Sequence, residues 1–313
     1  MKRCKKRSII IFFLLIALSL NSVFAGSNVD LERGIKLFDA EEYAEAKKIF
    51  TDVADKHSDN PEAWYFLGRL CLIDDDFDKA IEYLKKAVKL NQKSSEYHHW
   101  LGIAYGKKID KVSKIKLPFI AMKFKSALEK AVELDADNIQ ARLDLMGYYL
   151  NAPVIGGGSK EKANEQATEI KKRDPEVGKK AFFNIYISQA GSYIDKKDFE
   201  KAYQILVKIV KDYPEEKLPY CYIGYIGFKS GSHLEEAEKN MQICINMLSS
   251  LETDLEAESE TEKRWKSRIH VFHYMLGTIY EKNGKKDLAK KEYETALIID
   301  PDYKEAKEAL NKL

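Results

Sequence analysis

The C-terminal stretch 273–301 decides the fold, and it reads HYMLGTIYEKNGKKDLAKKEYETALIIDP. Its apolar positions recur at intervals of three and four residues, which gives each of two successive helices one apolar stripe. Gly284 lies between the two predicted helices. Pro301 ends the second helix, because the residue before a proline avoids the helical region of backbone space. The stretch therefore predicts a pair of antiparallel helices joined by a short turn.

The same spacing occurs near the N-terminus, where Trp64, Gly68, Ala80 and Leu84 occupy the corresponding positions. The small residues lie where two helices come closest, and the large ones fill the gap beside them. On these residues the chain resembles the tetratricopeptide repeat family, over nearly all of its length after residue 26. The resemblance implies an all-α solenoid of about seven helix-turn-helix repeats in a right-handed superhelix. First helices of the pairs would line a concave groove that binds a partner.

Seven repeats fit the sequence, with a C-terminal capping helix at 304–313 whose outer face is polar. We place the repeats at 27–60, 61–94, 95–138, 139–177, 183–216, 217–251 and 270–303. Insertions interrupt the period near 107–125, 151–158 and 252–269. The first insertion is rich in lysine, and the second contains the loop Ala-Pro-x-x-Gly-Gly-Gly at 152–158. This loop resembles that of a subgroup of exported bacterial repeat proteins with no defined activity.

The first 25 residues have the pattern of a cleaved secretory signal peptide. A basic start is followed by the apolar run Ile9–Leu20 and by small residues at Val23 and Ala25. We therefore expect export, to the periplasm or beyond the cell. Removing residues 1–25 takes five of the 52 Lys and Arg residues and none of the 50 Asp and Glu residues. The net charge becomes −3 instead of +2, which argues against nucleic-acid binding.

Three cysteines remain after residue 25, namely Cys71, Cys221 and Cys244. An odd number in an oxidising compartment leaves at least one free thiol or an intermolecular bridge. Cys71 and Cys244 fall at core positions of their repeats. Cys221 belongs to the other helix of the repeat that contains Cys244, so a bridge between those two is one alternative that the sequence leaves open.

Three patterns that could carry chemistry each depart from the motif they resemble. The run Gly156–Lys160 lacks the order of a phosphate-binding loop and suits a wide turn with Ser159 as helix N-cap. The acidic triplet 74–78 lacks the glycine and the final glutamate of a calcium loop. The histidine pairs 98–99 and 270/273 lack further ligands for zinc. We accordingly predict no enzymatic activity, no metal site and no cofactor.

The leading hypothesis is a non-enzymatic scaffold or adaptor of the cell envelope that binds a protein or peptide in the groove. One alternative is an accessory subunit of an envelope biogenesis or secretion complex, and another is a membrane-surface adaptor that uses the lysines of 107–125. Some members of the family clamp the C-terminal carboxylate of a peptide with Lys and Asn side chains from successive first helices. That pair is missing here, so such a carboxylate clamp is not expected. The positions that would line the groove are Tyr65, Arg69, Leu72, His99, Ile103, Leu143, Leu150, Ile187, Ile194, Tyr225, Phe228 and Tyr274.

Overall fold

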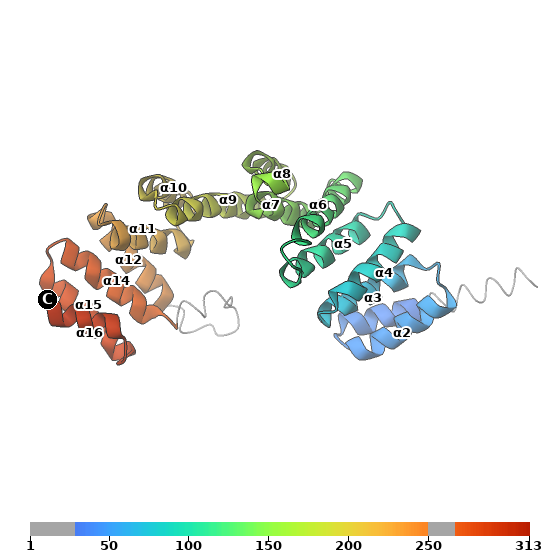
Figure 1. Cartoon of the computed structure of the whole chain (residues 1–313), viewed down its shortest axis with the longest axis horizontal. Coiled ribbons are helices and arrows are strands. Elements are labelled where there is room, and N and C mark those ends of the chain that lie inside the picture. The colour runs from blue at the N-terminus through green and yellow to red at the C-terminus, as the bar shows by residue number, and fades with distance from the viewer. Residues whose placement is uncertain (1–28, 250–266) are drawn as a thin grey trace, which may run out of the picture. The chain divides into compact units, whose positions relative to one another are not determined.

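The computed structural model describes residues 29–249 and 267–313, and every regular element within them is a helix (Figure 1). The prediction of an all-α chain built from successive helix pairs is confirmed. The chain divides into two compact units, residues 1–178 and 179–313. The predicted signal peptide and residues 252–266 of the third insertion lie outside the described residues.

The described part of the first unit, residues 29–178, forms four helix pairs. It begins with a helix over residues 29–39 and continues with α2 (Tyr43–Lys56), α3 (Pro61–Ile73), α4 (Phe77–Leu90), α5 (Ser95–Lys108), the 3₁₀ helix η1 (Ile109–Lys111), α6 (Leu117–Leu134), α7 (Ile139–Asn151), the 3₁₀ helix η2 (Val154–Gly156) and α8 (Lys160–Arg173).

The described residues of the second unit, 179–249 and 267–313, form three helix pairs and a last single helix. Its elements are α9 (Pro175–Asp195), which begins just before the boundary between the units, α10 (Phe199–Asp212), α11 (Lys217–Ser230), α12 (Leu234–Ser249), α14 (Ile269–Lys282), α15 (Lys286–Ile299) and α16 (Lys304–Lys312). The predicted capping segment 304–313 therefore contains the helix α16.

Short polar side chains start the helices by accepting hydrogen bonds from the free amides of the first turn. Asn60 accepts from the amides of Glu62 and Ala63 at the start of α3. Asp76, in the centre of the acidic triplet, accepts from the amide of Lys79 and so caps α4. Ser159 accepts from the amide of Lys162, which confirms its predicted role as N-cap of α8.

The boundary between the fourth and fifth predicted repeats differs from the structure. The sequence ended one repeat at 177 and began the next at 183, whereas α9 runs without a break from Pro175 to Asp195. Asp174 accepts hydrogen bonds from the amides of Glu176 and Val177, and Pro175 occupies the first helical position. Proline ends the preceding helix but is also favourable at this first position, where no amide donor is needed.

Glycines at the points where two paired helices cross determine how closely those helices approach each other. A Cβ atom on Gly68 would lie 2.5 Å from Cγ of Leu84, and one on Gly277 would lie 2.6 Å from the ring of Tyr293. Both large side chains are fully buried. The glycines that the sequence placed at the closest approach of two helices therefore have that role in α3–α4 and in α14–α15, because no other residue would fit.

Candidate binding surface

The first helices of the second unit form a cleft of about 400 Å³ between α9, α11 and α14. Its lining is mainly apolar and aromatic. The residues are Gly191, Ile194, Asp195, Cys221, Tyr222, Tyr225, Arg268, Phe272 and Met275. Two of the predicted groove residues, Ile194 and Tyr225, are brought together there from α9 and α11. The cleft also contains one acid and one base, Asp195 and Arg268, which can orient a polar backbone beside the apolar surface.

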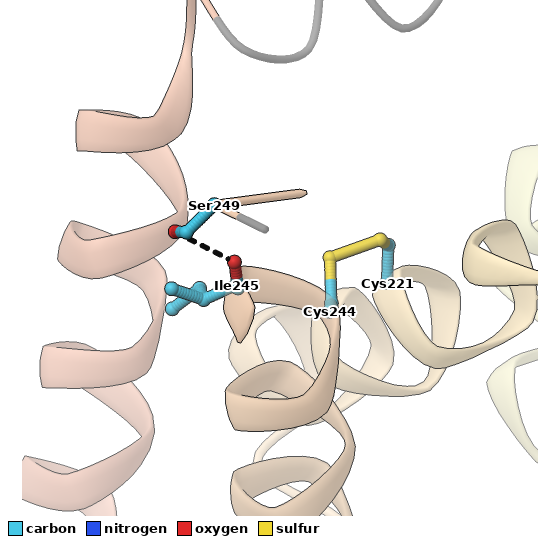
Figure 2. The surroundings of a disulfide bond; sticks show 4 residues. All are labelled: Cys221, Cys244, Ile245 and Ser249. Atoms are coloured by element: carbon cyan, nitrogen blue, oxygen red, sulfur yellow. Dashed lines mark hydrogen bonds between the residues drawn. A yellow bond between two sulfur atoms is a disulfide. The ribbon is translucent and has the colours of Figure 1, made fainter. Parts of the chain in front are cut away.

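A disulfide bond fixes the α11 wall of this cleft (Figure 2). Cys221 is bonded to Cys244 of α12, and their Cα atoms are 5.2 Å apart. Both cysteines are buried, and one turn beyond Cys244 the hydroxyl of Ser249 donates to the carbonyl of Ile245 at 2.9 Å. The bridge holds α11 against α12, so the cleft residues on α11 have a rigid support. Cys71 is the free thiol, and it is buried.

Phe228 and Tyr274 serve the packing between repeats as well as the surface. Their rings meet edge to face with centroids 5.9 Å apart, and both pack against the core cluster around Met241 and Tyr293. The ammonium group of Lys282 donates to the backbone carbonyl of Phe228. These two predicted groove residues thus join α11 to α14, and neither lines the cleft.

In the first unit, two of the predicted groove residues hydrogen-bond to neighbouring helices, and a third bonds within its own helix. The hydroxyl of Tyr65 donates to Glu96 of α5 at 2.7 Å, and Nε2 of His99 lies 2.7 Å from Oδ2 of Asp144 on α7. Tyr65 and His99 are buried. Burial raises the pKa of the Tyr65 phenol, and its hydrogen bond to Glu96 adds to the shift. Arg69 donates to the hydroxyl of Tyr65 at 3.2 Å.

The guanidinium group of Arg69 is held between two aromatic rings. Its Cζ atom lies 4.5 Å from the ring centroid of Phe38 and 4.4 Å from that of Trp100. Its Nε atom is buried and has no hydrogen-bond partner among the described residues. Trp100 in turn donates to Glu96 at 2.9 Å. Cation–π contacts of this kind stabilise an arginine on a packed surface, so this side chain has a structural role in joining α3 to α5.

The remaining predicted positions are half-buried. Leu72 packs on the N-terminal core, and Ile187 packs with Ile194 on the core cluster of the second unit. Leu143 lines a second cleft near the α7–α8 loop. Ile103 and Leu150 are partly covered on α5 and α7. The structure therefore brings together two groups from the predicted set. Tyr65, Arg69 and His99 take part in a bonded network in the first unit, and Ile194 and Tyr225 line a cleft in the second.

Sequence reasoning missed the residues that complete both groups. Glu96, Trp100 and Asp144 in the first unit and Phe272 and Met275 in the second were not selected. Glu96 and Trp100 are separated by four residues on one helix, a spacing that places their side chains side by side. That spacing was the one signal in the sequence, since the other contacts join separate helices.

The histidines of the pairs 98–99 and 270/273 lie beside carboxylates or a backbone carbonyl. Nδ1 of His273 lies 2.6 Å from Glu292, and Nε2 of His270 lies 3.6 Å from Asp300. Nε2 of His98 lies 3.2 Å from the carbonyl of Gln92, and desolvation lowers the pKa of this imidazole. Among residues 29–249 and 267–313, no group of three or more His, Cys, Asp or Glu side chains is arranged to hold a metal ion. Within the same ranges, no helix combines the length and apolar character needed to cross a membrane.

Comparison with known proteins agrees with this geometry. Residues 37–101 and 271–303 each match a tetratricopeptide repeat family model. No curated protein matches the chain. A structure of the C-terminal part of a TPR repeat-containing protein from Cytophaga hutchinsonii superposes with a TM-score of 0.63 at 16% identity, over 90% of this chain and 99% of that one.

A tetratricopeptide repeat protein from Parabacteroides merdae superposes with a TM-score of 0.51 at 11% identity, over 91% of this chain and 97% of the other. Identities this low carry information about the fold alone. The two family matches fall on the first and the last parts of the described repeats, and the two superpositions cover 90% and 91% of the chain. Residues 37–101 and 271–303 are therefore tetratricopeptide repeats, and the chain has the fold of tetratricopeptide repeat proteins, which serves generally as a scaffold for protein–protein interaction.

Proposed function

We propose that this chain is a non-enzymatic scaffold that binds an apolar or aromatic peptide segment in the cleft between α9, α11 and α14. The observation that carries the proposal is the lining of that cleft, where Tyr222, Tyr225, Phe272 and Met275 surround a volume of about 400 Å³. Aromatic side chains give a large contact area at a small entropy cost, and they dominate the binding energy of protein interfaces. A hydrophobic anchor residue of the partner would occupy this volume.

The charged residues of the cleft suggest how the partner is oriented. Asp195 lies at the end of α9 and Arg268 lies just before α14. These two charges favour a partner segment that carries a base and an acid on either side of its apolar anchor, with the base facing Asp195 and the acid facing Arg268. The side chains of Tyr65, Arg69 and His99 in the first unit bond to their own neighbours, so we assign the anchor to the second unit.

We also propose that the chain works outside the cytoplasm, in the cell envelope. The N-terminal pattern of residues 1–25 supports export. The bridge between Cys221 and Cys244 supports it independently, since disulfides persist in oxidising compartments and are rare in the cytosol.

The proposal is tested by partner capture from envelope extract of the source organism. The purified chain is immobilised, and captured proteins are quantified by mass spectrometry for the wild type and for Tyr225→Ala. We expect the variant to lose at least about 30-fold in affinity for the captured protein, the size of a hot-spot truncation of about 2 kcal/mol. Peptides spanning that protein then locate the bound segment by direct titration.

Three controls make the result specific. Tyr186→Ala removes an exposed tyrosine of α9 that does not line the cleft, and it should leave capture unchanged. Lys111→Glu with Lys114→Glu tests the lysine-rich insertion, and we expect little effect on capture. Circular dichroism checks that each variant is folded. Undiminished capture by folded Tyr225→Ala, with loss in the lysine variant, would overturn the proposal and assign binding to the insertion.

A further inference from the structure

The two inserted segments of the first unit lie next to each other at one end of its helices. A cleft of about 460 Å³ has residues of the first insertion and of α6 on one side, including Ile109 and Leu117, and the α7–α8 loop on the other, including Ala152 and Pro153. The α7–α8 loop is held to α7, because the hydroxyl of Tyr148 donates to the carbonyl of Gly156 at 2.6 Å. The insertions therefore form one continuous surface.

Five large apolar side chains project from this surface into solvent. Their exposed fractions are 83% for Ile115, 63% for Phe119, 61% for Met122, 87% for Val154 and 99% for Ile155. Phe119 and Met122 are three residues apart near the start of α6, so they share one face of that helix, and Ile115 lies in the turn just before it. The opposite face of α6 is buried through Ala127, Leu128 and Ala131. Single exposed apolar residues need no explanation, but a cluster of five at one edge marks an interaction site.

Unpaired lysines surround the apolar side chains. The segment 107–125 contains seven lysines and one acid, Asp110. Lys108 pairs with Asp78, Lys125 lies 3.6 Å from Glu129, and Lys123 lies over the ring of Tyr105. Lys107, Lys111, Lys114 and Lys116 are exposed, and their ammonium groups have no ion-pair partner in the described part of the chain. We name these four lysines and the five apolar residues the basic–apolar edge.

We propose that the basic–apolar edge docks onto the surface of an anionic lipid bilayer, with its apolar side chains inserted among the headgroups. Exposed Phe, Ile and Met side chains bordered by lysines have the composition of interfacial membrane-binding segments. Each lysine near an anionic surface strengthens binding roughly fivefold. A protein partner fits less well, since lysine is depleted in protein–protein interfaces. The edge belongs to the first unit, and the proposed peptide cleft belongs to the second.

Vesicle binding tests the proposal on the full chain. Binding is measured by co-sedimentation with vesicles of phosphatidylcholine, with and without phosphatidylglycerol. We expect binding that requires phosphatidylglycerol and that falls steeply when salt rises from about 0.05 to about 0.5 M. Lys111→Gln with Lys114→Gln should weaken it about 30-fold. Phe119→Ser with Ile155→Ser should weaken it roughly tenfold or more, through lost insertion of apolar surface.

Matched variants elsewhere on the chain control for net charge and apolarity. Lys239→Gln with Lys291→Gln removes the same charge from other exposed sites, and Ile298→Ser removes an isoleucine that is 80% exposed on α15. Both should bind vesicles like the wild type. Every variant carries the same N-terminal apolar run, so its contribution is common to all. Absent binding, equal binding to vesicles without phosphatidylglycerol, or equal losses in the edge and control variants would each overturn the proposal.

Discussion

Nε2 of His99 lies 2.7 Å from Oδ2 of Asp144, and this contact joins α5 of the third repeat to α7 of the fourth. The imidazole is buried, whereas the side chain of Asp144 is partly exposed. A position that in the repeat family faces the groove is here used to hold two successive first helices together. The same is true of Tyr65, whose hydroxyl reaches Glu96 on the next first helix. In the first unit, side chains of Tyr65 and His99 therefore join successive first helices.

Asp144→Ala should lower the free energy of unfolding by about 1–3 kcal/mol, because it leaves the buried imidazole of His99 without its partner. The measurement is urea unfolding followed by circular dichroism. Asp137→Ala is the matched control, since Asp137 pairs with Arg173 at 2.8 Å but is 84% exposed. Exposed ion pairs contribute little to stability, so we expect Asp137→Ala to change the free energy of unfolding by less than about 0.5 kcal/mol. Equal losses of unfolding free energy in the two variants would show that the contact of His99 with Asp144 contributes no more than an exposed ion pair.

The sequence was sufficient for the helix pairs because their spacing follows from local geometry. Gly277 and Tyr293, like Gly68 and Leu84, must meet if two helices of this length fold back on each other, and both pairs do. The start of α9 was misplaced because Pro175 has two roles, to end one helix and to begin the next. Local patterns alone could not choose between them.

The candidate site was less predictable than the fold. Family positions identified Ile194 and Tyr225, which do line the cleft. Phe272 and Met275 complete the cleft from another repeat. Whether their side chains point into it depends on how α11 and α14 cross. The contact of His99 with Asp144 spans 45 residues along the chain. No periodicity within one repeat specifies such contacts, since they depend on the rotation between neighbouring repeats.

Alkaline pH should destabilise the chain through its buried tyrosines. Burial raises the pKa of the Tyr97 phenol to about 12 from its ordinary value of 10.0, and the nearby carboxylates of Glu62 and Glu96 add to the shift. The folded chain therefore favours the neutral phenol. This contribution to stability is complete below pH 10 and is lost as the pH rises through about 12. Urea unfolding across this range should show the decline.

Tyr97→Phe tests the contribution of this one phenol, because it keeps the ring that stacks on Tyr65 at 4.9 Å and removes the ionisable group. Its stability should fall less between pH 10 and about 12 than that of the wild type. Tyr186→Phe, at an exposed ring of α9, is the control and should follow the wild type. A decline in Tyr97→Phe as steep as in the wild type would contradict the assignment.

Export should remove residues 1–25, with cleavage after Ala25. The basic start, the twelve-residue apolar run Ile9–Leu20 and the small residues Val23 and Ala25 predict this site. Intact mass spectrometry of the protein recovered from the producing cell measures the N-terminus directly. Ala25→Arg replaces the small residue that the cleavage site requires, so the precursor of this variant should stay uncut. Retention of Met1 in the wild-type protein would contradict the prediction.

Reduction of the bridge between Cys221 and Cys244 should destabilise the second unit. The bond closes a loop over a sequence separation of 23 residues between α11 and α12. A loop of that length restricts the unfolded chain enough to stabilise the fold by about 3 kcal/mol. Guanidinium unfolding with and without dithiothreitol measures the loss. Because Cys221 lies in the lining of the cleft, reduction should also loosen the support of Tyr222 and Tyr225 and weaken partner capture.

Two variants separate the bridge from the general effect of a reductant. In Cys221→Ala with Cys244→Ala, dithiothreitol should have no effect, and stability should equal that of the reduced wild type to within about 1 kcal/mol, the scale of the small cavities left by sulfur. Cys71→Ala removes the buried free thiol and keeps the bridge, so its stability should still fall on reduction. If the double variant were as stable as the oxidised wild type, the bridge would contribute nothing to the fold, and the rigidity of the α11 wall would have to come from packing alone.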